Sequence, residues 1–150
     1  MKTLVVYDSV YGNTEKIARA IGEAIAPSGE LKVLRASEAK PSDLQSLDLL
    51  IVGAPTQAGK ATTAIQEFLD KIPANALKNV RVAAFDTRVK VFIAKLFGYA
   101  AGRIADSLKD KGGNLAAAPE GFLVKGREGP LVEGELERAA GWAKGLVTSK

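Results

Sequence analysis

Hydrophobic residues follow two patterns that alternate along the chain. Short runs of aliphatic and β-branched residues, as at 4–7 and 49–52, are typical of buried strands. Between such runs, apolar residues recur three or four positions apart, which is typical of amphipathic helices. We predict strands at 4–7, 31–35, 49–52, 80–85 and 115–124, and helices along the stripes 17–25, 65–72, 93–108 and 132–147.

The order of these elements indicates the fold class. Strands that alternate with helices require a parallel sheet covered by helices on both faces. The run at 49–52 is apolar at every position, as expected at the centre of such a sheet, whereas 31–35 alternates and fits a more exposed position. The sequence therefore predicts an α/β fold, with one domain over 1–150 and a doubly wound, five-stranded parallel sheet.

The composition excludes several kinds of chemistry. The sequence contains no Cys and no His. Disulfides, a thiol nucleophile, a Cys/His zinc site, a His-ligated haem and a Ser-His-Asp triad are therefore all excluded. Any redox chemistry would have to come from a bound organic cofactor.

The charge and the hydropathy indicate the kind of partner and the location. The chain has 21 Lys and Arg against 17 Asp and Glu, a net charge of +4. The charges are scattered and form no basic stripe interleaved with aromatic residues, so we do not expect the protein to bind nucleic acid. A partner protein with an acidic surface is compatible with the positive net charge. The apolar run at 4–7 is too short for a signal peptide, and no stretch approaches the roughly 20 apolar residues of a membrane span. We expect a cytoplasmic protein that does not enter a membrane.

Three loops are candidates for a binding site. Doubly wound sheets bind ligands beyond the carboxyl ends of their strands, where the strand order reverses. The loops that follow the first, third and fourth predicted strands are Asp8–Thr14, Gly53–Thr62 and Asp86–Val91. A Gly- and Pro-rich segment at Gly126–Pro130 either lies near the same site or only connects two elements.

The first loop has the composition of an anion site. It combines the hydroxyls of Ser9, Tyr11 and Thr14 with the amide of Asn13 and with Gly12, at the start of a predicted helix. Unpaired N–H groups and the helix dipole favour a negative charge there. The alternative is that Asn13 or Thr14 only caps the helix.

The segment Val5–Ile21 resembles the flavodoxin signature. The positions that carry the resemblance are Val5, Val6, Tyr7, Ser9, Gly12, Thr14, Ala18 and Ile21. Within this segment, the sequence of residues 7–15 is most similar to the flavodoxin module of flavodiiron proteins. The resemblance implies a flavodoxin-like sheet in the order 2-1-3-4-5 and FMN as the cofactor. It also implies that the FMN phosphate is held by Ser9, Val10, Tyr11, Gly12, Asn13 and Thr14, with Tyr11 standing where many flavodoxins have Thr.

The same resemblance assigns the second loop to the flavin ring. In flavodoxins a Gly-Ser/Ala-Pro-Thr turn brings backbone groups to the ring edge, and Gly53-Ala54-Pro55-Thr56 is similar. The implied contact residues are Pro55, Thr56, Gln57, Ala58 and Gly59. A nucleotide-hydrolysing P-loop is disfavoured, because Gly53 and Gly59-Lys60 are one residue too far apart and Ala61 replaces the required hydroxyl. A plain connecting loop is the remaining alternative.

The third loop departs from the family pattern. No Gly and no aromatic residue lies between Phe85 and Phe92, where flavodoxins usually place a Gly-rich loop with a stacking aromatic. Backbone groups of Asp86, Thr87 and Arg88 are still expected at the polar edge of the flavin. Cations at Arg88, Lys90 and Lys60 would raise the reduction potential by stabilising added negative charge. The alternative is a solvated basic loop without flavin contact.

Three functions remain open on the sequence alone. The first is an FMN-binding, flavodoxin-like electron carrier that serves a redox partner protein with an acidic surface, as a monomer or a homodimer. The second is an FMN-dependent oxidoreductase of the NAD(P)H:quinone type. The third is an interaction module that kept the fold and binds no flavin. Fold analogy does not separate them.

Overall fold

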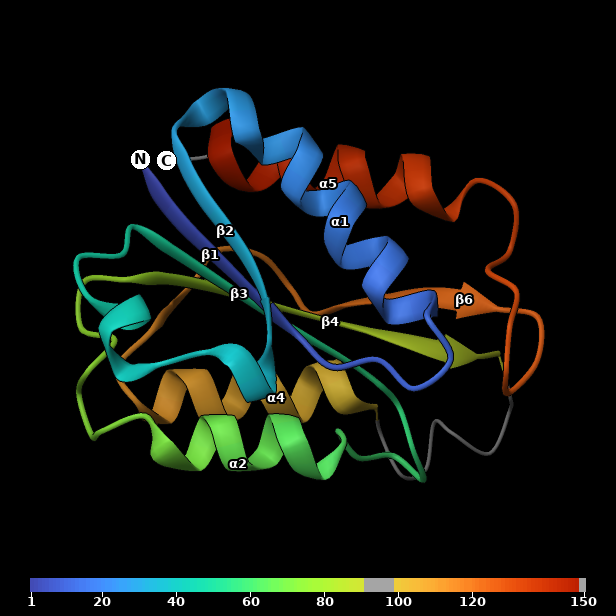
Figure 1. Cartoon of the computed structure of the whole chain (residues 1–150), viewed down its shortest axis with the longest axis horizontal. Helices are drawn as coiled ribbons and strands as arrows, with labels where there is room; N and C mark the ends of the chain where they lie inside the picture. Colours follow the sequence, from blue (N-terminus) through green and yellow to red (C-terminus); the bar gives the residue numbers. More distant parts are fainter. Residues whose placement is uncertain (91–98, 149–150) are drawn as a thin grey trace.

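A computed structural model describes residues 1–90 and 99–148 (Figure 1). The strands are β1 (Lys2–Tyr7), β2 (Glu30–Arg35), β3 (Leu49–Pro55), β4 (Arg81–Val89), β5 (Asn114–Leu115) and β6 (Glu120–Val124). The α-helices are α1 (Asn13–Ile25), α2 (Thr63–Lys71), α4 (Ala100–Asp110) and α5 (Glu135–Thr148). Short 3-10 helices are η1 (Ala26–Ser28), η2 (Ala36–Glu38) and η3 (Pro41–Leu44). The amino-terminal part of the helix predicted over 93–108 falls largely outside the described residues.

The strands form one parallel sheet in the order β2-β1-β3-β4-β5, and β6 also pairs with β4. Figure 1 shows α1 and α5 over one face and α2 and α4 over the other. The predicted fold class and strand order are therefore confirmed. The apolar run predicted to be central lies in β3, which is buried from Leu49 to Ala54, and the alternating run lies in the edge strand β2.

The last predicted strand is divided in two. Leu115 pairs with Val82, and Glu120 pairs with Phe85. The segment from Leu115 to Glu120 therefore advances five residues while β4 advances three. The intervening stretch contains Pro119, which has no N–H to donate to a ladder. The extra residues leave the sheet there, and β6 then resumes pairing beside the second half of β4.

Alternate residues of each strand fill two apolar layers. Leu4 and Val6 pack with α2 and α4, whereas Val5 and Tyr7 pack with α1 and α5. On the α5 side, Phe85, Phe122 and Trp142 form a mutual edge-to-face cluster with ring centroids 6.0–6.3 Å apart. This geometry is favourable for aromatic rings and fixes α5 over β4 and β6.

Gly53 in β3 makes room for this cluster. The ring of Phe85 lies against the Gly53 backbone, and a Cβ atom at Gly53 would stand 2.1 Å from the Cζ atom of Phe85. Because Gly53 has no positive φ, the space it leaves, and not its conformational freedom, requires glycine here. Phe85 is completely buried, so its ring has little freedom to move aside.

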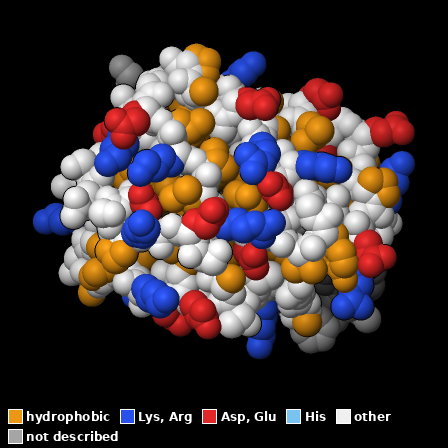
Figure 2. Space-filling model, viewed as in Figure 1, with side chains coloured by type: hydrophobic (Ala, Val, Ile, Leu, Met, Phe, Trp, Pro, Cys, Tyr) orange, Lys and Arg blue, Asp and Glu red, His pale blue; other side chains and the backbone are white. Residues whose placement is uncertain are grey.

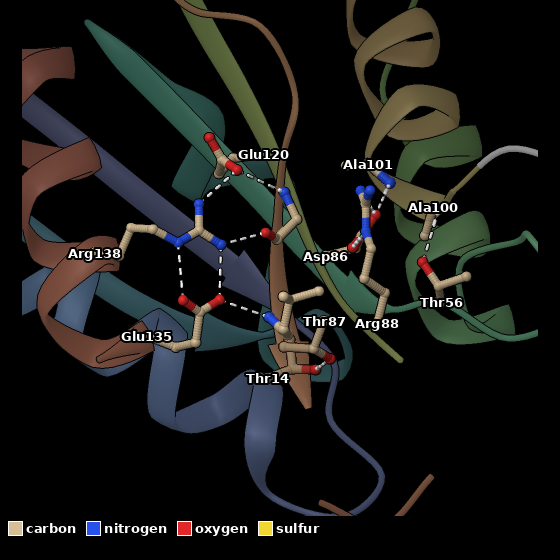
Figure 3. A network of polar contacts seen from close by, with 12 residues as sticks. Thr14, Thr56, Asp86, Thr87, Arg88, Ala100, Ala101, Glu120, Glu135 and Arg138 are labelled. Atoms are coloured by element: carbon tan, nitrogen blue, oxygen red, sulfur yellow. Dashed lines mark hydrogen bonds and ion pairs between the residues drawn. The ribbon is translucent and has the colours of Figure 1, made fainter. Parts of the chain in front are cut away.

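A charged cluster joins α5 to β6 (Figure 3). The Glu135 carboxylate accepts hydrogen bonds from the Leu123 N–H (2.7 Å) and from the Nε (2.9 Å) and Nη2 (2.7 Å) atoms of Arg138. Arg138 also donates from Nη1 to Glu120 at 2.7 Å and lies 4.6 Å from the ring centre of Phe122. These hydrogen bonds, above all those from Arg138, lower the pKa of Glu135, although its burial opposes the shift.

Replacing Gly53 by alanine is expected to lower the free energy of unfolding by about 1–3 kcal/mol, because the methyl group overpacks the Phe85 ring. Urea denaturation measures this. The matched control is Gly141→Ala in α5, where a Cβ would meet open space. There the same change should raise stability by up to about 1 kcal/mol. Equal stability of Gly53→Ala and the parent chain would contradict the packing argument.

Replacing Glu135 by glutamine is expected to destabilise the protein in a pH-dependent way. The lowered pKa means that the folded state favours the carboxylate, so the stabilisation is present above the unfolded pKa of about 4.3 and is lost as the pH falls through the folded value. We expect a loss of about 1–3 kcal/mol at neutral pH that shrinks in acid.

Denaturation measured between neutral and acidic pH tests this expectation. Glu133→Gln is the control, because the Glu133 side chain is 95% exposed and its ion pair with Lys125 is long, at 4.0 Å. It should change stability little at any pH. A Glu135→Gln deficit that stays constant into acid would show that the ionised form is not what the fold stabilises.

Candidate functional site

A cavity of about 520 Å³ opens at the carboxyl ends of β1, β3 and β4. Its size lies within the range of small-molecule and cofactor sites. Four segments contribute to its wall: the β1–α1 loop, the β3–α2 loop, the end of β4, and β6 with the loop that follows it. The lining residues are Val10, Tyr11, Asn13, Thr14, Pro55, Thr56, Gln57, Ala58, Thr87, Arg88, Val89, Val124 and Arg127.

Ser9 holds the β1–α1 loop in shape. Its hydroxyl accepts hydrogen bonds from the N–H groups of Gly12 (3.1 Å) and Glu15 (3.3 Å). Gly12 precedes the helix with φ 92°, a left-handed conformation that favours glycine. Neither Ser9 nor Gly12 lines the cavity, although both shape the loop that does.

The capping alternative for this loop is wrong. The Asn13 amide donates to the carbonyl of Glu128 at 3.1 Å, and the Thr14 hydroxyl shares a 2.8 Å hydrogen bond with that of Thr87. Both side chains are therefore engaged with distant segments and not with the first turn of α1. The N-cap residue Gly12 supplies no side-chain cap, and the first-turn N–H of Glu15 is accepted by Ser9 instead.

Backbone donors at the start of α1 are consequently available. Across residues 1–90 and 99–148, the N–H groups of Val10, Tyr11, Asn13 and Thr14 donate to no protein acceptor. All four residues line the cavity. Such donors at a helix N-terminus, together with the helix dipole, suit an anion.

The β3–α2 loop is tied to β4 and α4. The Thr56 N–H donates to the Thr87 carbonyl at 2.9 Å, and the Thr56 hydroxyl accepts from the Ala100 N–H at 3.0 Å (Figure 3). Pro55, Thr56, Gln57 and Ala58 all line the cavity, and their contact with a flavin ring stays a prediction.

The tip of this loop is a tight turn. Gln57 and Lys60 exchange two backbone hydrogen bonds of 2.8 and 2.9 Å, and the residues between them, Ala58 (φ 49°) and Gly59 (φ 79°), are both left-handed. Gly59 is buried and its carbonyl accepts from the Nε atom of Arg103 at 2.8 Å. Gly59 therefore shapes the turn but does not line the cavity.

The prediction of a third loop beginning at Asp86 is wrong. β4 continues to Val89, because β6 pairs with residues 85–89 and supplies the ladder partners that the local sequence does not reveal. Asp86, Thr87 and Arg88 are thus strand residues. Thr87 and Arg88 reach the cavity, whereas Asp86 is completely buried beside it.

Asp86 and Arg88 form a buried ion pair (Figure 3). The Nε and Nη2 atoms of Arg88 each lie 2.7 Å from a carboxylate oxygen of Asp86, which also accepts from the Ala101 N–H at 2.9 Å. The guanidinium carbon of Arg88 stands 3.4 Å from the ring centre of Tyr99. Arg88 therefore faces the cavity with its charge compensated, while Lys60 and Lys90 are not among the lining residues. The raised reduction potential stays a prediction.

The segment after β6 is the part of the wall that sequence reasoning left undecided. Arg127 lines the cavity, and Glu128 receives the Asn13 hydrogen bond. A Cβ atom at Gly129 would lie 2.6 Å from Nδ2 of Asn13, so glycine permits this close approach. The turn composition of 126–130 was the available signal, but it could not show which segment the turn meets.

The charge around the cavity favours an anionic ligand. Among the described lining residues, Arg88 and Arg127 are charged and no residue is acidic. On the face drawn in Figure 2, by contrast, basic and acidic side chains are interspersed. Along the described ranges we find no helical segment with the length and hydropathy of a membrane span, and no cluster of carboxylates placed to hold a metal ion.

Comparison with known proteins agrees with this architecture. A curated relative, the putative diflavin flavoprotein A 4 of Synechocystis sp., is 31% identical over 90 residues, covering 57% of this chain and 15% of the relative. An NAD(P)H dehydrogenase (quinone) of Gluconacetobacter diazotrophicus is 30% identical over 91 residues, covering 47% of this chain and 46% of the relative. The matches thus cover less than half of the length of these relatives.

The whole chain also superimposes on a solved structure. A flavodoxin from the domain Archaea aligns with a TM-score of 0.83 at 23% identity, over 99% of this chain and 97% of the other. The sequence model of the flavodoxin domain family matches residues 4–91, more than half of the chain. The chain is accordingly a member of the flavodoxin domain family, whose cofactor is FMN.

Proposed function

We propose that this protein binds FMN in the cavity beyond β1, β3 and β4 and carries electrons between redox proteins. The observation that carries the proposal is the set of N–H groups at the start of α1 that have no acceptor in the described ranges, in a cavity whose described charged lining residues are both arginines. FMN would supply the electron chemistry, and the protein would bind, orient and shield it.

The phosphate would lie at the β1–α1 loop. The N–H groups of Val10, Tyr11, Asn13 and Thr14 are its donors in this proposal, and Arg127 adds a nearby positive charge. Ser9 and Gly12 serve indirectly, because they fix the loop conformation. The residues present therefore fit a phosphate monoester.

The flavin ring would lie between the β3–α2 loop and the end of β4. Apolar contacts are available from Val89 and Val124, and backbone groups from Gln57, Ala58 and Thr87. The Asp86–Arg88 pair would hold the strand under the ring in place while adding little net charge. A net charge of +4 favours a redox partner with an acidic surface.

A quinone-type oxidoreductase is the second candidate. This function requires one face of a bound flavin ring to be open to a small substrate, and Tyr11 is the only aromatic residue among the described lining residues. The relative named as an NAD(P)H dehydrogenase (quinone) is consistent with it. Oxidation of NADPH in the presence of FMN and a soluble quinone, followed by absorbance, separates the two functions. An electron carrier should give no sustained turnover.

FMN binding is expected to be saturable and to depend on Thr14. In a fluorescence-quenching titration, Thr14→Ala should weaken FMN binding about tenfold, because the buried Thr14–Thr87 hydrogen bond that orients the loop is lost. Thr148→Ala, at the far end of α5, removes a hydroxyl that donates to the Lys144 carbonyl, far from the cavity, and should have no effect. Absence of saturable quenching by FMN in the parent chain would rule out both candidate functions.

A further inference from the structure

Arg35 touches the β1–α1 loop from outside the cavity. It ends the edge strand β2, next to Tyr7 in the β1–β2 register, and its guanidinium carbon lies 5.3 Å from the Tyr7 ring centre. From there Nη1 donates to the Ser9 carbonyl at 3.2 Å, and Nη2 donates to Oε1 of Glu15 at 3.3 Å. Nη1 is also 3.5 Å from Oδ1 of Asp8. One side chain thus contacts the start of the loop, its interior and the first turn of the helix.

These contacts place a positive charge beside two carboxylates that flank the loop. Asp8 and Glu15 stand at its two ends, and the segment 8–14 contains no Lys or Arg. A phosphate dianion bound there would meet two carboxylates without a cation of the loop to offset them. Arg35 lies within ion-pair distance of both. The pKa of Glu15 is lowered, chiefly by its hydrogen bond from Arg19 and further by the charge of Arg35, so the carboxylate is ionised.

The same contacts determine which backbone groups are free. Arg35 engages the carbonyl of Ser9, while the hydroxyl of Ser9 accepts the N–H groups of Gly12 and Glu15. Ser9 is therefore fixed at two points. The N–H groups of Val10, Tyr11, Asn13 and Thr14, which donate to no acceptor in the described ranges, belong to residues that line the cavity. Arg35 itself does not line the cavity, so it would act through the loop and not by touching the ligand.

We propose that Arg35 is a positioning residue that enables the β1–α1 loop to accept a phosphate dianion, by compensating Asp8 and Glu15 and by fixing the Ser9 carbonyl. The inference rests on the proposed FMN site and deepens it. It assigns part of the preference for FMN over the unphosphorylated flavin to a side chain on the neighbouring edge strand.

The test compares FMN with riboflavin, which lacks the phosphate. Dissociation constants of the full chain for both flavins are measured by fluorescence quenching. Arg35→Gln should weaken FMN binding about tenfold and riboflavin binding less than about twofold. The reason is that the uncompensated carboxylates repel the phosphate, which riboflavin lacks. The control Lys32→Gln removes one positive charge from the same strand, but its Nζ atom bonds Asp43, away from the loop. It should leave both constants within about twofold.

A second substitution distinguishes charge compensation from a general structural role. In the Arg35→Gln background, Glu15 has lost Arg35 but keeps its ion pair with Arg19 at 2.8 Å. Glu15→Gln then removes this carboxylate and should recover part of the lost FMN affinity, about threefold or more. A purely structural defect would not be rescued in this way. Arg35→Lys keeps the charge without the forked geometry, so its FMN affinity should lie between those of the parent and Arg35→Gln. If circular dichroism shows that Arg35→Gln is unfolded, Arg35→Lys takes its place in the test.

The outcomes separate this inference from the proposed function. If the parent chain binds FMN saturably and Arg35→Gln retains its preference for FMN over riboflavin, the role of Arg35 is overturned and the FMN site stands. Equal weakening of both flavins also overturns it. If the parent chain binds neither flavin, the FMN site fails and this inference fails with it.

Discussion

The hydrogen-bonded ladder that joins β1, β3 and β4 determines the geometry of the site. Tyr7, Gly53 and Phe85 are adjacent across these strands. The chain leaves β1 at Tyr7, whereas β3 continues to Pro55 and β4 to Val89. The pairing with β4 extends one residue beyond β3, because the Thr56 N–H donates to the Thr87 carbonyl at 2.9 Å. Because the strands are parallel, three carboxyl ends meet there and a single cavity forms between their loops.

Two buried carboxylates each pair with an arginine of their own element and also accept a backbone N–H from a neighbouring element. Asp86 is paired with Arg88 and bonded to the start of α4, and Glu135 is paired with Arg138 and bonded to β6. Removing one member of such a pair leaves an uncompensated buried charge, so each pair resists displacement of the elements it joins. The Asp86–Arg88 pair lies in the end of β4, which supplies Thr87 and Val89 to the cavity wall.

The β1–α1 loop depends in turn on residues that are not its own. Thr14 is held by Thr87, Asn13 by the Glu128 carbonyl, and Ser9 by Arg35. Each contact uses a side-chain group that could otherwise have capped the helix or faced solvent. Within the described ranges the backbone N–H groups of Asn13 and Thr14 are left without protein acceptors, and this makes the start of the helix suitable for an anion.

The sequence by itself determined the fold class, because the alternation of short apolar runs with helical stripes is local and a parallel arrangement follows from it. The strand order followed from the family resemblance, and two of the three predicted loops border the cavity. The signature over Val5–Ile21 is also contiguous, so the family resemblance was visible without the structure.

Only the tertiary structure decided that Asp86–Arg88 belongs to a strand, that 126–130 forms part of the wall and that Arg35 holds the first loop. Pairing with β6 extended β4 across residues more than thirty positions away. The partners of Asn13 and Ser9 lie 115 and 26 positions along the chain from them. Periodicity and local spacing carry no information about such contacts, because they arise only when the sheet and its covering helices bring distant segments together.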